Sequence, residues 1–361
     1  MGETYPNIFA APGTYVQGAG VLAAIGPHLA RLGKRALGVL DPVVREQVEP
    51  ALSAGCKSEG IAWRAEPFLG ECTEATVERL VTTARDWRPE MAVAAGGGKA
   101  LDTGKLLAEA LGIPSVMIPT IASTDAPTSR VAVLYDDDHA QVRVARLRAN
   151  PGLVLVDTAI IAKAPIRFLV AGMGDALATW PEARTCAAGA GRTPVGGRPS
   201  KAALALAELC YRTVLTYGRR AQKDAAAKRV TEAVEAVVEA NILLSGLGFE
   251  SGGLAAAHSL YAGLSTLPAG ADYLHGEKVA FGVIVQAGLE EWPASERDEL
   301  LDFYHDVGLP STLTGLGLGG ATAADLRRVA EVACRPGSHM HNLLRPVSVE
   351  ELVGVLESLR G

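Results

Sequence analysis

The chain has 361 residues and a formal net charge of −6, and because one hydrophobic core rarely serves that length, we expect two domains. The negative charge gives no electrostatic footprint for nucleic acid, and no apolar run approaches the roughly 18–20 residues of a membrane span. The first residues lack the basic region and apolar core expected of a signal peptide, and the five cysteines lack CxxC spacing, which favours reduced thiols in the cytoplasm over a disulfide framework or a cysteine zinc site.

Short apolar runs alternate with helical patterns in the first half of the chain. Buried strands are predicted over residues 36–40, 91–95, 114–118 and 153–157, helices over 21–32, 73–87 and 105–111, and a hairpin over 130–146 with His139 at its tip. Strand–helix alternation with such short connections predicts a doubly wound, mainly parallel sheet.

Three consecutive glycines, residues 96–98, separate the strand at 91–95 from the helix that follows. Glycine lets the backbone approach a pyrophosphate, and the next helix N-terminus offers unpaired N–H groups and a favourable dipole. We interpret this junction as a candidate phosphate site, with a plain tight turn as the alternative. The GxGxxG fingerprint is absent, and a Walker A motif fails on its glycine spacing and because Lys105 precedes a leucine.

Two acidic residues follow predicted strands. A carboxylate at Asp41 can accept hydrogen bonds from both ribose hydroxyls of an adenosine and would repel a 2′-phosphate, which favours NAD over NADP; a helix-capping or turn role is the alternative. The segment 118–129 packs hydroxyl groups and Asp125 into a loop with two prolines. Loops at the carboxyl ends of parallel strands bind ligands in such folds, although an ordinary polar loop has a similar composition.

Strand patterns disappear after about residue 164. Helices are predicted over residues 201–217, 225–246, 253–264, 277–291, 326–332 and 349–359, and a loop over 189–199. The sequence therefore predicts a dinucleotide-binding α/β domain over residues 1–163 and an all-α, metal-binding domain over residues 164–361.

Two histidines of the helical half, His258 and His275, lie among small and apolar residues. Buried imidazoles need polar partners, so the two either share a metal ion or are separately satisfied core residues. Asp175 stands at an apolar helix start, where it could simply complement the helix dipole. Together, one Asp and two His supply the ligand set of a catalytic zinc with open coordination for water or substrate. We interpret the three as a candidate metal site.

Six segments carry longer motifs: residues 15–18, 96–103, 119–127, 174–180, 244–258 and 275–282. They resemble the iron-containing alcohol dehydrogenase superfamily and, within it, the NAD-dependent glycerol dehydrogenases. The similarity runs along nearly the whole chain. It implies a dinucleotide-binding domain, a helical domain, and an active-site cleft between them.

The resemblance also implies roles for individual residues. Asp175, His258 and His275 would hold the metal through which catalysis occurs, and Asp125 would contact the polyol. NAD would be bound by Asp41, Gly97, Gly98, Lys99, Asp102, Thr120, Ser123, Ser129, Val131 and Tyr135. Iron-dependent members carry a further His one helical turn after the Asp, where this chain has Thr179, so zinc is favoured over iron.

Three positions depart from the pattern of the relatives. Tyr261 stands where close relatives often carry a second His, and Arg130 stands where they have a small residue. Pro181 follows Asp175 closely and is expected to kink or end that helix early. Tyr261 and Arg130 therefore mark places where this chain could shape its own pocket.

The resemblance implies reversible, zinc-dependent oxidation of glycerol to dihydroxyacetone with NAD, by hydride transfer from the secondary hydroxyl carbon. The alternative is a dehydrogenase of another 1,2-diol, an amino alcohol or glycerol-1-phosphate in the same superfamily. More distant alternatives are a lyase of the dehydroquinate synthase type, whose metal set has Glu in place of Asp175, and a non-catalytic NAD-binding protein. The resemblance further implies a homo-oligomer, with an octamer as the expected size.

Overall fold

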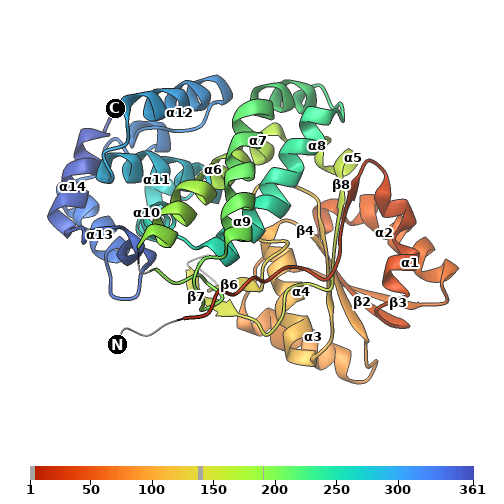
Figure 1. The fold of residues 1–361 in the computed structure, drawn as a ribbon. Helices are drawn as coiled ribbons and strands as arrows, with labels where there is room; N and C mark the ends of the chain where they lie inside the picture. The colour runs from red at the N-terminus through yellow and green to blue at the C-terminus, as the bar shows by residue number, and fades with distance from the viewer. Residues whose placement is uncertain (1–4, 137–140, 190) are drawn as a thin grey trace. The chain divides into compact units, whose positions relative to one another are not determined.

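The computed structural model describes residues 5–136, 141–189 and 191–361, and the chain forms two compact units (Figure 1). The α/β unit consists of Ala11–Ala164 and Lys228–Val230. The helical unit contains the rest of the described chain, including residues 5–10. His139, the predicted hairpin tip, lies outside the described residues.

A six-stranded sheet, in the order β1-β8-β5-β4-β2-β3, forms the centre of the α/β unit. Its strands are β1 (Tyr15–Gly18), β2 (Arg35–Leu40), β3 (Ala62–Pro67), β4 (Met91–Gly96), β5 (Ser115–Pro119) and β8 (Leu153–Asp157). Every neighbouring pair is parallel. A separate antiparallel hairpin, β6 (Val131–Tyr135) with β7 (Gln141–Arg146), confirms the hairpin predicted there.

Helices cover both faces of this sheet. They are η1 (Val21–Ala24), α1 (Gly26–Leu29), α2 (Pro42–Ser58), α3 (Glu74–Arg85), α4 (Gly98–Leu111) and α5 (Thr158–Ile161). Because side chains alternate along a strand, Ala36 and Leu40 of β2 pack with α1 and α2, whereas Leu37 and Val39 pack with α3 and α4. The predicted doubly wound parallel sheet is therefore confirmed.

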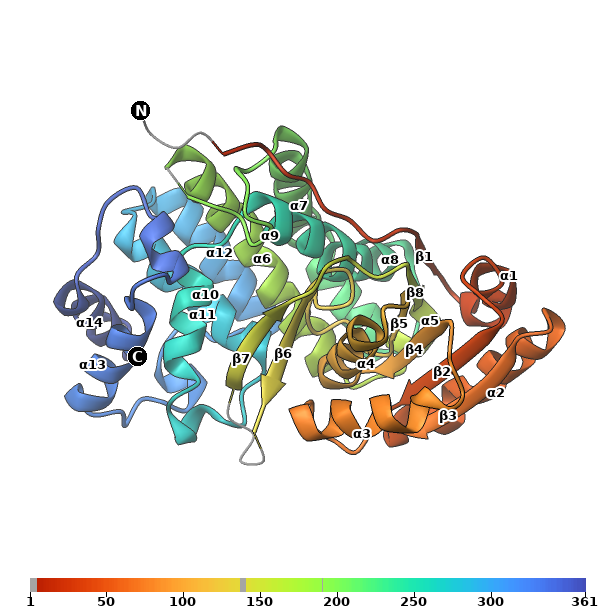
Figure 2. The ribbon, with the colours of Figure 1, turned by 90° about the horizontal axis from the view of Figure 1, so that it is seen from below.

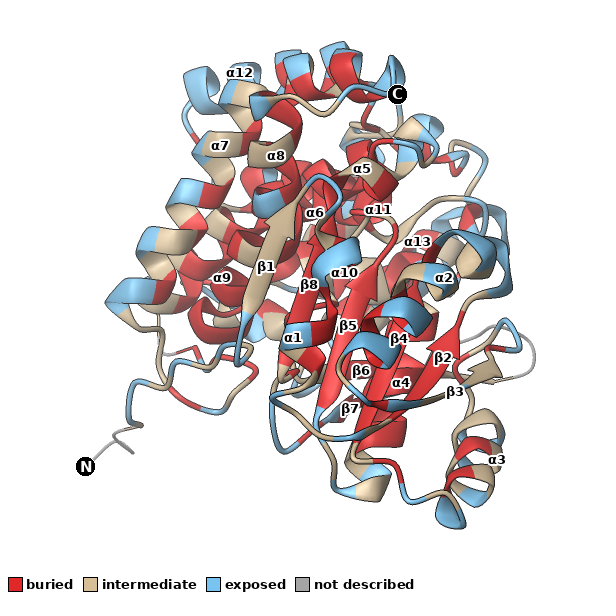
Figure 3. Ribbon diagram, turned by 90° about the vertical axis from the view of Figure 1, so that its right-hand side faces the viewer, coloured by how far each residue is buried: buried red, intermediate tan, exposed pale blue. Residues whose placement is uncertain are grey.

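The helical unit consists of α6 (Ile166–Ala188), α7 (Lys201–Ala226), α8 (Glu232–Glu239), η2 (Ala240–Leu244), α9 (Ser245–Gly252), α10 (Ala256–Leu264), η3 (Pro268–Gly270), α11 (His275–Leu289), α12 (Ala294–Val307), η4 (Thr314–Leu316), α13 (Ala323–Ala333), η5 (His339–Asn342) and α14 (Val349–Ser358). Helix α11 packs against both α6 and α10, as the view from below shows (Figure 2). Every residue of β4, β5 and β8 is buried, as is most of α6 and α11 (Figure 3).

A hydrophobic core fixes α10 and α11 in the helical unit. Leu260 and Leu264 of α10 pack with Phe281 and Val285 of α11 and with side chains of α13 and α14. Because each residue of an α-helix is rotated by about 100° from the last, His258 lies on the opposite side of α10 from this core. The core therefore orients the histidine without enclosing it.

Several predicted elements were wrong in extent. The helix predicted over 21–32 is the 3-10 turn η1 followed by the single turn α1, because Pro27 lacks the N–H group that would continue the preceding turn. The helix predicted over 225–246 does not start there: α7 ends at Ala226, and α8 begins after Thr231, whose hydroxyl accepts the Val234 N–H. Helix α6 continues through Pro181 to Ala188, so the expected early end is also wrong.

The sequence analysis predicts no strand at β1 or β3 and no helix at α2 or α12. Strand β3 lies at the edge of the sheet and has little buried surface, so its apolar pattern is weak. In the described part of the chain, no helix is both long and apolar enough to cross a bilayer.

Candidate metal centre

Three helices of the helical unit bring Asp175, His258 and His275 together. Asp175 lies in the middle of α6, His258 in the first turn of α10, and His275 at the start of α11. Their potential donor atoms all lie within 4.8 Å of one another. The Oδ1 atom of Asp175 is 3.1 Å from Nε2 of His275 and 3.4 Å from Nε2 of His258. The three residues predicted to form a metal site therefore lie together in the structure.

Two glycines adjacent to the ligands let α6 and α11 cross closely. A Cβ atom at Gly174 would lie 2.5 Å from the carbonyl oxygen of Gly276. A Cβ atom at Gly276 would lie 2.6 Å from the carbonyl carbon of Ala171. Since Gly174 precedes Asp175 and Gly276 follows His275, the close crossing places the carboxylate beside the imidazole.

The Asp175 carboxylate is well placed to act as a ligand to a cation. It is fully buried, and its Oδ2 atom has no hydrogen-bond partner among the described residues. Leaving a buried carboxylate oxygen unpaired is costly, and a cation bound to this carboxylate would offset that cost. The two Oδ1–Nε2 separations, 3.1 and 3.4 Å, are also close to the roughly 3.4 Å between two ligand atoms of a tetrahedral zinc site with bonds of about 2.1 Å. The residues present thus fit a metal.

Opposite electrostatic influences act on these groups. Burial by itself would raise the pKa of the Asp175 carboxyl, but His275 and hydrogen bonds from both imidazoles hold that pKa well below its usual range. Burial would lower the pKa of His258, but the carboxylates of Glu182 and Asp175 raise it well above the usual value. The site therefore concentrates negative charge around the imidazoles, which favours a bound cation.

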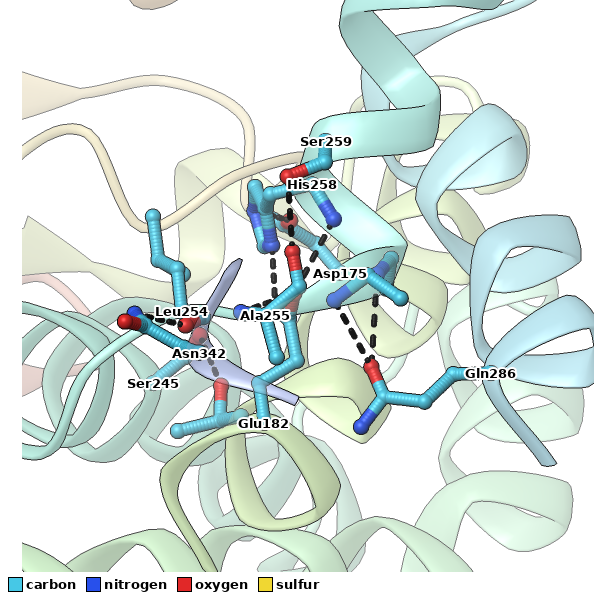
Figure 4. A network of polar contacts seen from close by, with 12 residues as sticks. Asp175, Glu182, Ser245, Leu254, Ala255, His258, Ser259, Gln286 and Asn342 are labelled. Atoms are coloured by element: carbon cyan, nitrogen blue, oxygen red, sulfur yellow. Dashed lines mark hydrogen bonds and ion pairs between the residues drawn. The ribbon is translucent and has the colours of Figure 1, made fainter. Parts of the chain in front are cut away.

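Glu182 was missed in the sequence. Its carboxylate is fully buried on α6, and Oε2 lies 2.5 Å from Nδ1 of His258 (Figure 4). It follows Asp175 by two helical turns, so both carboxylates face the same side of α6. That spacing was a readable signal, but only the fold shows that His258 is its partner.

Two other residues near the ligands have clear positions. The ring of Tyr261, one turn after His258, meets the ring of His275 edge-on with centroids 4.2 Å apart. The hydroxyl of Thr179, one turn after Asp175, lies 2.9 Å from the hydroxyl of Ser245. The hydroxyl of Thr179 is thus engaged with the neighbouring helix α9.

The cofactor candidates lie in the α/β unit, after neighbouring strands. Asp41, Gly97 and Thr120 follow the carboxyl ends of β2, β4 and β5, which are adjacent in the sheet. The Asp41 N–H donates to Ala95 O at 2.9 Å, and the Thr120 N–H donates to Gly96 O at 3.1 Å. These contacts bring the three strand ends together, where parallel sheets bind ligands.

Asp41 and the glycine loop have distinct local roles. Oδ1 of Asp41 accepts the Val43 N–H at 3.0 Å and caps α2, as the capping interpretation expected. At the start of α4, Gly97 is the N-cap, and no side chain of the described residues caps the helix. The N-terminus of α4 is therefore not closed by a protein side chain, as a phosphate site requires.

A buried lysine, Lys105, contacts Asp102 and Val131, two of the candidate NAD residues. Lys105 is 1% exposed and pairs with Asp102 Oδ1 at 2.8 Å, and its ammonium donates to the carbonyl oxygens of Ala126 and Val131. Asp102 Oδ2 accepts the Val133 N–H at 2.9 Å. Asp102 is therefore an internal anchor between α4 and β6.

The remaining candidates lie in the first turn of α4, on β6 and in the loop after β5. Lys99 pairs with Glu71 at 2.5 Å, and its ammonium lies 4.9 Å from the ring centre of Tyr135. In the loop after β5, Thr120, Asp125 and Ser129 are buried, whereas Ser123 is partly exposed. The structure thus collects the predicted NAD and polyol residues in one unit.

Comparison with known proteins shows what the chain is similar to. Residues 12–158 match the family model described as iron-containing alcohol dehydrogenase. The chain is 46% identical over 337 residues to the glycerol dehydrogenase of Escherichia coli O6:H1, with 93% of this chain and 92% of that protein covered. It is 43% identical over 336 residues to the glycolaldehyde reductase of Halobacterium salinarum, with coverage of 93% and 92%.

A solved structure agrees over nearly the full length. The glycerol dehydrogenase from Schizosaccharomyces pombe is similar with a TM-score of 0.95 and 33% sequence identity. The similarity covers 99% of this chain and 91% of that chain.

Proposed function

The chain belongs to the iron-containing alcohol dehydrogenase family, and we propose that it is an NAD-dependent glycerol dehydrogenase with a metal held by Asp175, His258 and His275. The observation that carries this proposal is the Asp175 carboxylate. One oxygen contacts both imidazoles, and the other is buried without a hydrogen-bond partner in the described chain. The predicted reaction is reversible oxidation of the secondary hydroxyl of glycerol to the ketone.

Zinc is the metal we propose. The three ligands leave coordination open for an alcohol, as in catalytic zinc sites, and Thr179, at the position of the further ligand in iron-dependent relatives, is bonded to Ser245. When bound, zinc would supply Lewis acidity that favours the alkoxide of the alcohol and polarises the ketone in the reverse reaction. The side chain of His275 is 29% exposed, so solvent reaches the three ligands from the side of His275.

The α/β unit would bind the cofactor. We propose that the N–H groups at Gly97 and Gly98 hold the pyrophosphate of NAD. Asp41 would accept hydrogen bonds from the adenosine ribose while it caps α2, because a carboxylate offers about four acceptor positions. The same negative charge would disfavour NADP. Asp125 would accept a hydrogen bond from a substrate hydroxyl.

A reductase of small hydroxyaldehydes is the second candidate. It is favoured by the 43% identity to a glycolaldehyde reductase, and it would use the same metal and cofactor residues. Other 1,2-diols and amino alcohols fit the same chemistry. A phosphorylated substrate is less well supported, since Lys278, one turn after His275, is 7% exposed and burial lowers its pKa.

The decisive experiment combines metal analysis with a substrate panel. The purified protein is assayed with glycerol, 1,2-propanediol, glycolaldehyde and glycerol-1-phosphate, each with NAD or NADP in the matching redox state. We expect the highest kcat/KM for glycerol with NAD, loss of activity with a chelator, and recovery with Zn²⁺. The absence of turnover with every polyol by zinc-loaded protein would contradict the proposal.

The assembly and location are also proposals. All five cysteines lie in the described chain and none of them forms a disulfide there, which supports a cytoplasmic location. We propose a homo-oligomer, and light scattering tests the expected octamer.

A further inference from the structure

The helix that carries His258 begins without a capping side chain of its own. Its N-cap residue is Ala255, which has no polar side chain to accept an N–H group of the first turn. Helices leave about four such N–H groups without intrahelical partners, and all four residues from Ala255 to His258 are at most partly exposed. Other parts of the protein must therefore satisfy these groups.

Two buried side chains from neighbouring helices do so. Oε1 of Glu182 accepts the N–H groups of Ala255 at 2.8 Å and His258 at 3.0 Å. Oε1 of Gln286 accepts the N–H groups of the two residues between them, at 3.1 and 3.3 Å. Figure 4 shows both side chains directed at the start of α10. Glu182 and Gln286 thus form a shared cap on this helix.

The two capping residues come from the helices that carry the other metal ligands. Glu182 lies on α6, two turns after Asp175, and Gln286 lies on α11, three turns after His275. Both side chains are fully buried. The cap therefore ties the position of α10 directly to the two helices that complete the metal site.

Glu182 also determines which imidazole nitrogen of His258 faces the other ligands. Its Oε2 lies 2.5 Å from Nδ1, whereas Nε2 lies 3.4 Å from Asp175 Oδ1. A carboxylate accepts, so Nδ1 carries the hydrogen of this contact, and Nε2, the nitrogen that faces Asp175, is the one that would give its lone pair to a metal. Carboxylate–histidine pairs orient metal-binding imidazoles in this way.

The orientation of Gln286 is set by a second layer of contacts. Its Nε2 donates to Glu290 Oε1 at 3.2 Å. Glu290 in turn accepts from the Thr185 hydroxyl at 2.6 Å and from the Trp292 indole N–H at 2.7 Å. Because Glu290 takes the amide N–H, the amide oxygen of Gln286 is turned to α10.

We propose that Glu182 and Gln286 are positioning residues of the metal centre. Together they cap the first turn of α10, which contains His258. Glu182 also selects the tautomer in which Nε2 binds the metal. The inference rests on the proposed function only in requiring that the three-residue site binds a metal. Neither residue touches substrate or cofactor in this proposal.

The variant Glu182→Gln tests the role of the carboxylate. Its amide oxygen can still accept from the backbone, but the NH₂ group then faces Nδ1 and favours the tautomer whose hydrogen is on Nε2. We expect zinc affinity, measured with Zn²⁺ alone against a chromophoric chelator, to fall about 10- to 100-fold. The variant Gln286→Met, which removes the other acceptor, should weaken zinc binding in the same direction.

The control is Asp224→Asn, a similar change at a buried carboxylate of the same unit that pairs with Arg220 and Thr231. It should leave zinc affinity unchanged, and circular dichroism of each metal-free variant verifies folding. Zinc binding by Glu182→Gln at the wild-type affinity would overturn the inference alone. A wild-type protein that binds no zinc would overturn the proposed function and the inference with it.

A measurement on the unaltered protein covers the case in which the variants do not fold. Two-bond ¹H–¹⁵N correlation spectra of zinc-loaded protein labelled at histidine report which ring nitrogen is protonated. We expect His258, assigned by its absence from His258→Gln, to carry hydrogen on Nδ1 and zinc on Nε2. The opposite assignment would refute the role given to Glu182.

Discussion

A single methyl group at Gly276 tests whether the crossing of α6 and α11 sets the metal site. In Gly276→Ala, the new carbon would lie 2.6 Å from the carbonyl carbon of Ala171, and nearer still to its oxygen. Ordinary contacts begin at 3.4 Å, so the backbone of α6 or α11 must retreat by about 0.8 Å or more. No flexible side chain can absorb this change, because the obstructing atoms belong to the main chain.

The expected consequence is loss of zinc affinity. Asp175 Oδ1 and His275 Nε2 are now 3.1 Å apart, and the same retreat would bring them to about 3.9 Å, beyond the roughly 3.4 Å separation of ligands in tetrahedral zinc. Overpacking of this kind also costs about 1–3 kcal/mol of folding free energy. We expect Gly276→Ala to bind zinc at least 10-fold more weakly, as measured by chelator competition, and to unfold at lower urea concentration.

The matched control lies on the same helix. Gly288 is exposed, and the nearest atom to a Cβ there is a side-chain atom, Cγ1 of Val355, at 3.3 Å. Alanine at this position should keep zinc affinity and change the folding free energy by no more than about 1 kcal/mol. Wild-type zinc affinity in Gly276→Ala, with Gly288→Ala also unchanged, would show that the helix crossing does not govern the metal site.

Three further substitutions separate the roles of single residues. His275→Ala should abolish turnover and zinc binding while NADH binding, followed by fluorescence, persists; unchanged zinc content would disprove the metal assignment. Asp41→Ser keeps a capping oxygen for α2 but removes the negative charge, so we expect the ratio of kcat/KM for NADP to that for NAD to rise about 10-fold or more. An unaltered ratio would remove Asp41 from the ribose site. Lys105→Met leaves Asp102 buried without its cation and should cost about 3–5 kcal/mol in urea unfolding. A cost below about 1 kcal/mol would mean that the ion pair of Lys105 with Asp102 contributes little to stability.

The sequence predicted the parts of the fold that have a strong local pattern. Strands β4 and β8 are continuous apolar runs because both faces of the sheet are covered. Helix α12 was overlooked although Leu300, Phe303, Tyr304 and Val307 are buried at helical spacing. Its many charged residues hid that stripe, so this omission was avoidable.

Other features depend on tertiary structure, which local sequence patterns do not reveal. Pro181 usually indicates a helix end, yet α6 continues beyond it within a well-packed unit. The metal ligands were recognisable by residue type and by their surrounding motifs. Glu182, by contrast, gains its role from a contact with His258, 76 positions along the chain. A helix-capping contact between distant segments cannot be deduced from spacing alone.

The two candidate binding sites are built separately, which makes the proposed function testable in parts. The metal ligands and the residues that cap α10 all belong to the helical unit, whereas the NAD candidates all belong to the α/β unit. Each unit has its own hydrophobic clusters. Removal of zinc should therefore leave the Kd for NADH within about twofold, and Asp41→Ser should leave the zinc affinity unchanged. A large loss of NADH affinity in the zinc-free protein would mean that the metal orders residues of the cofactor site.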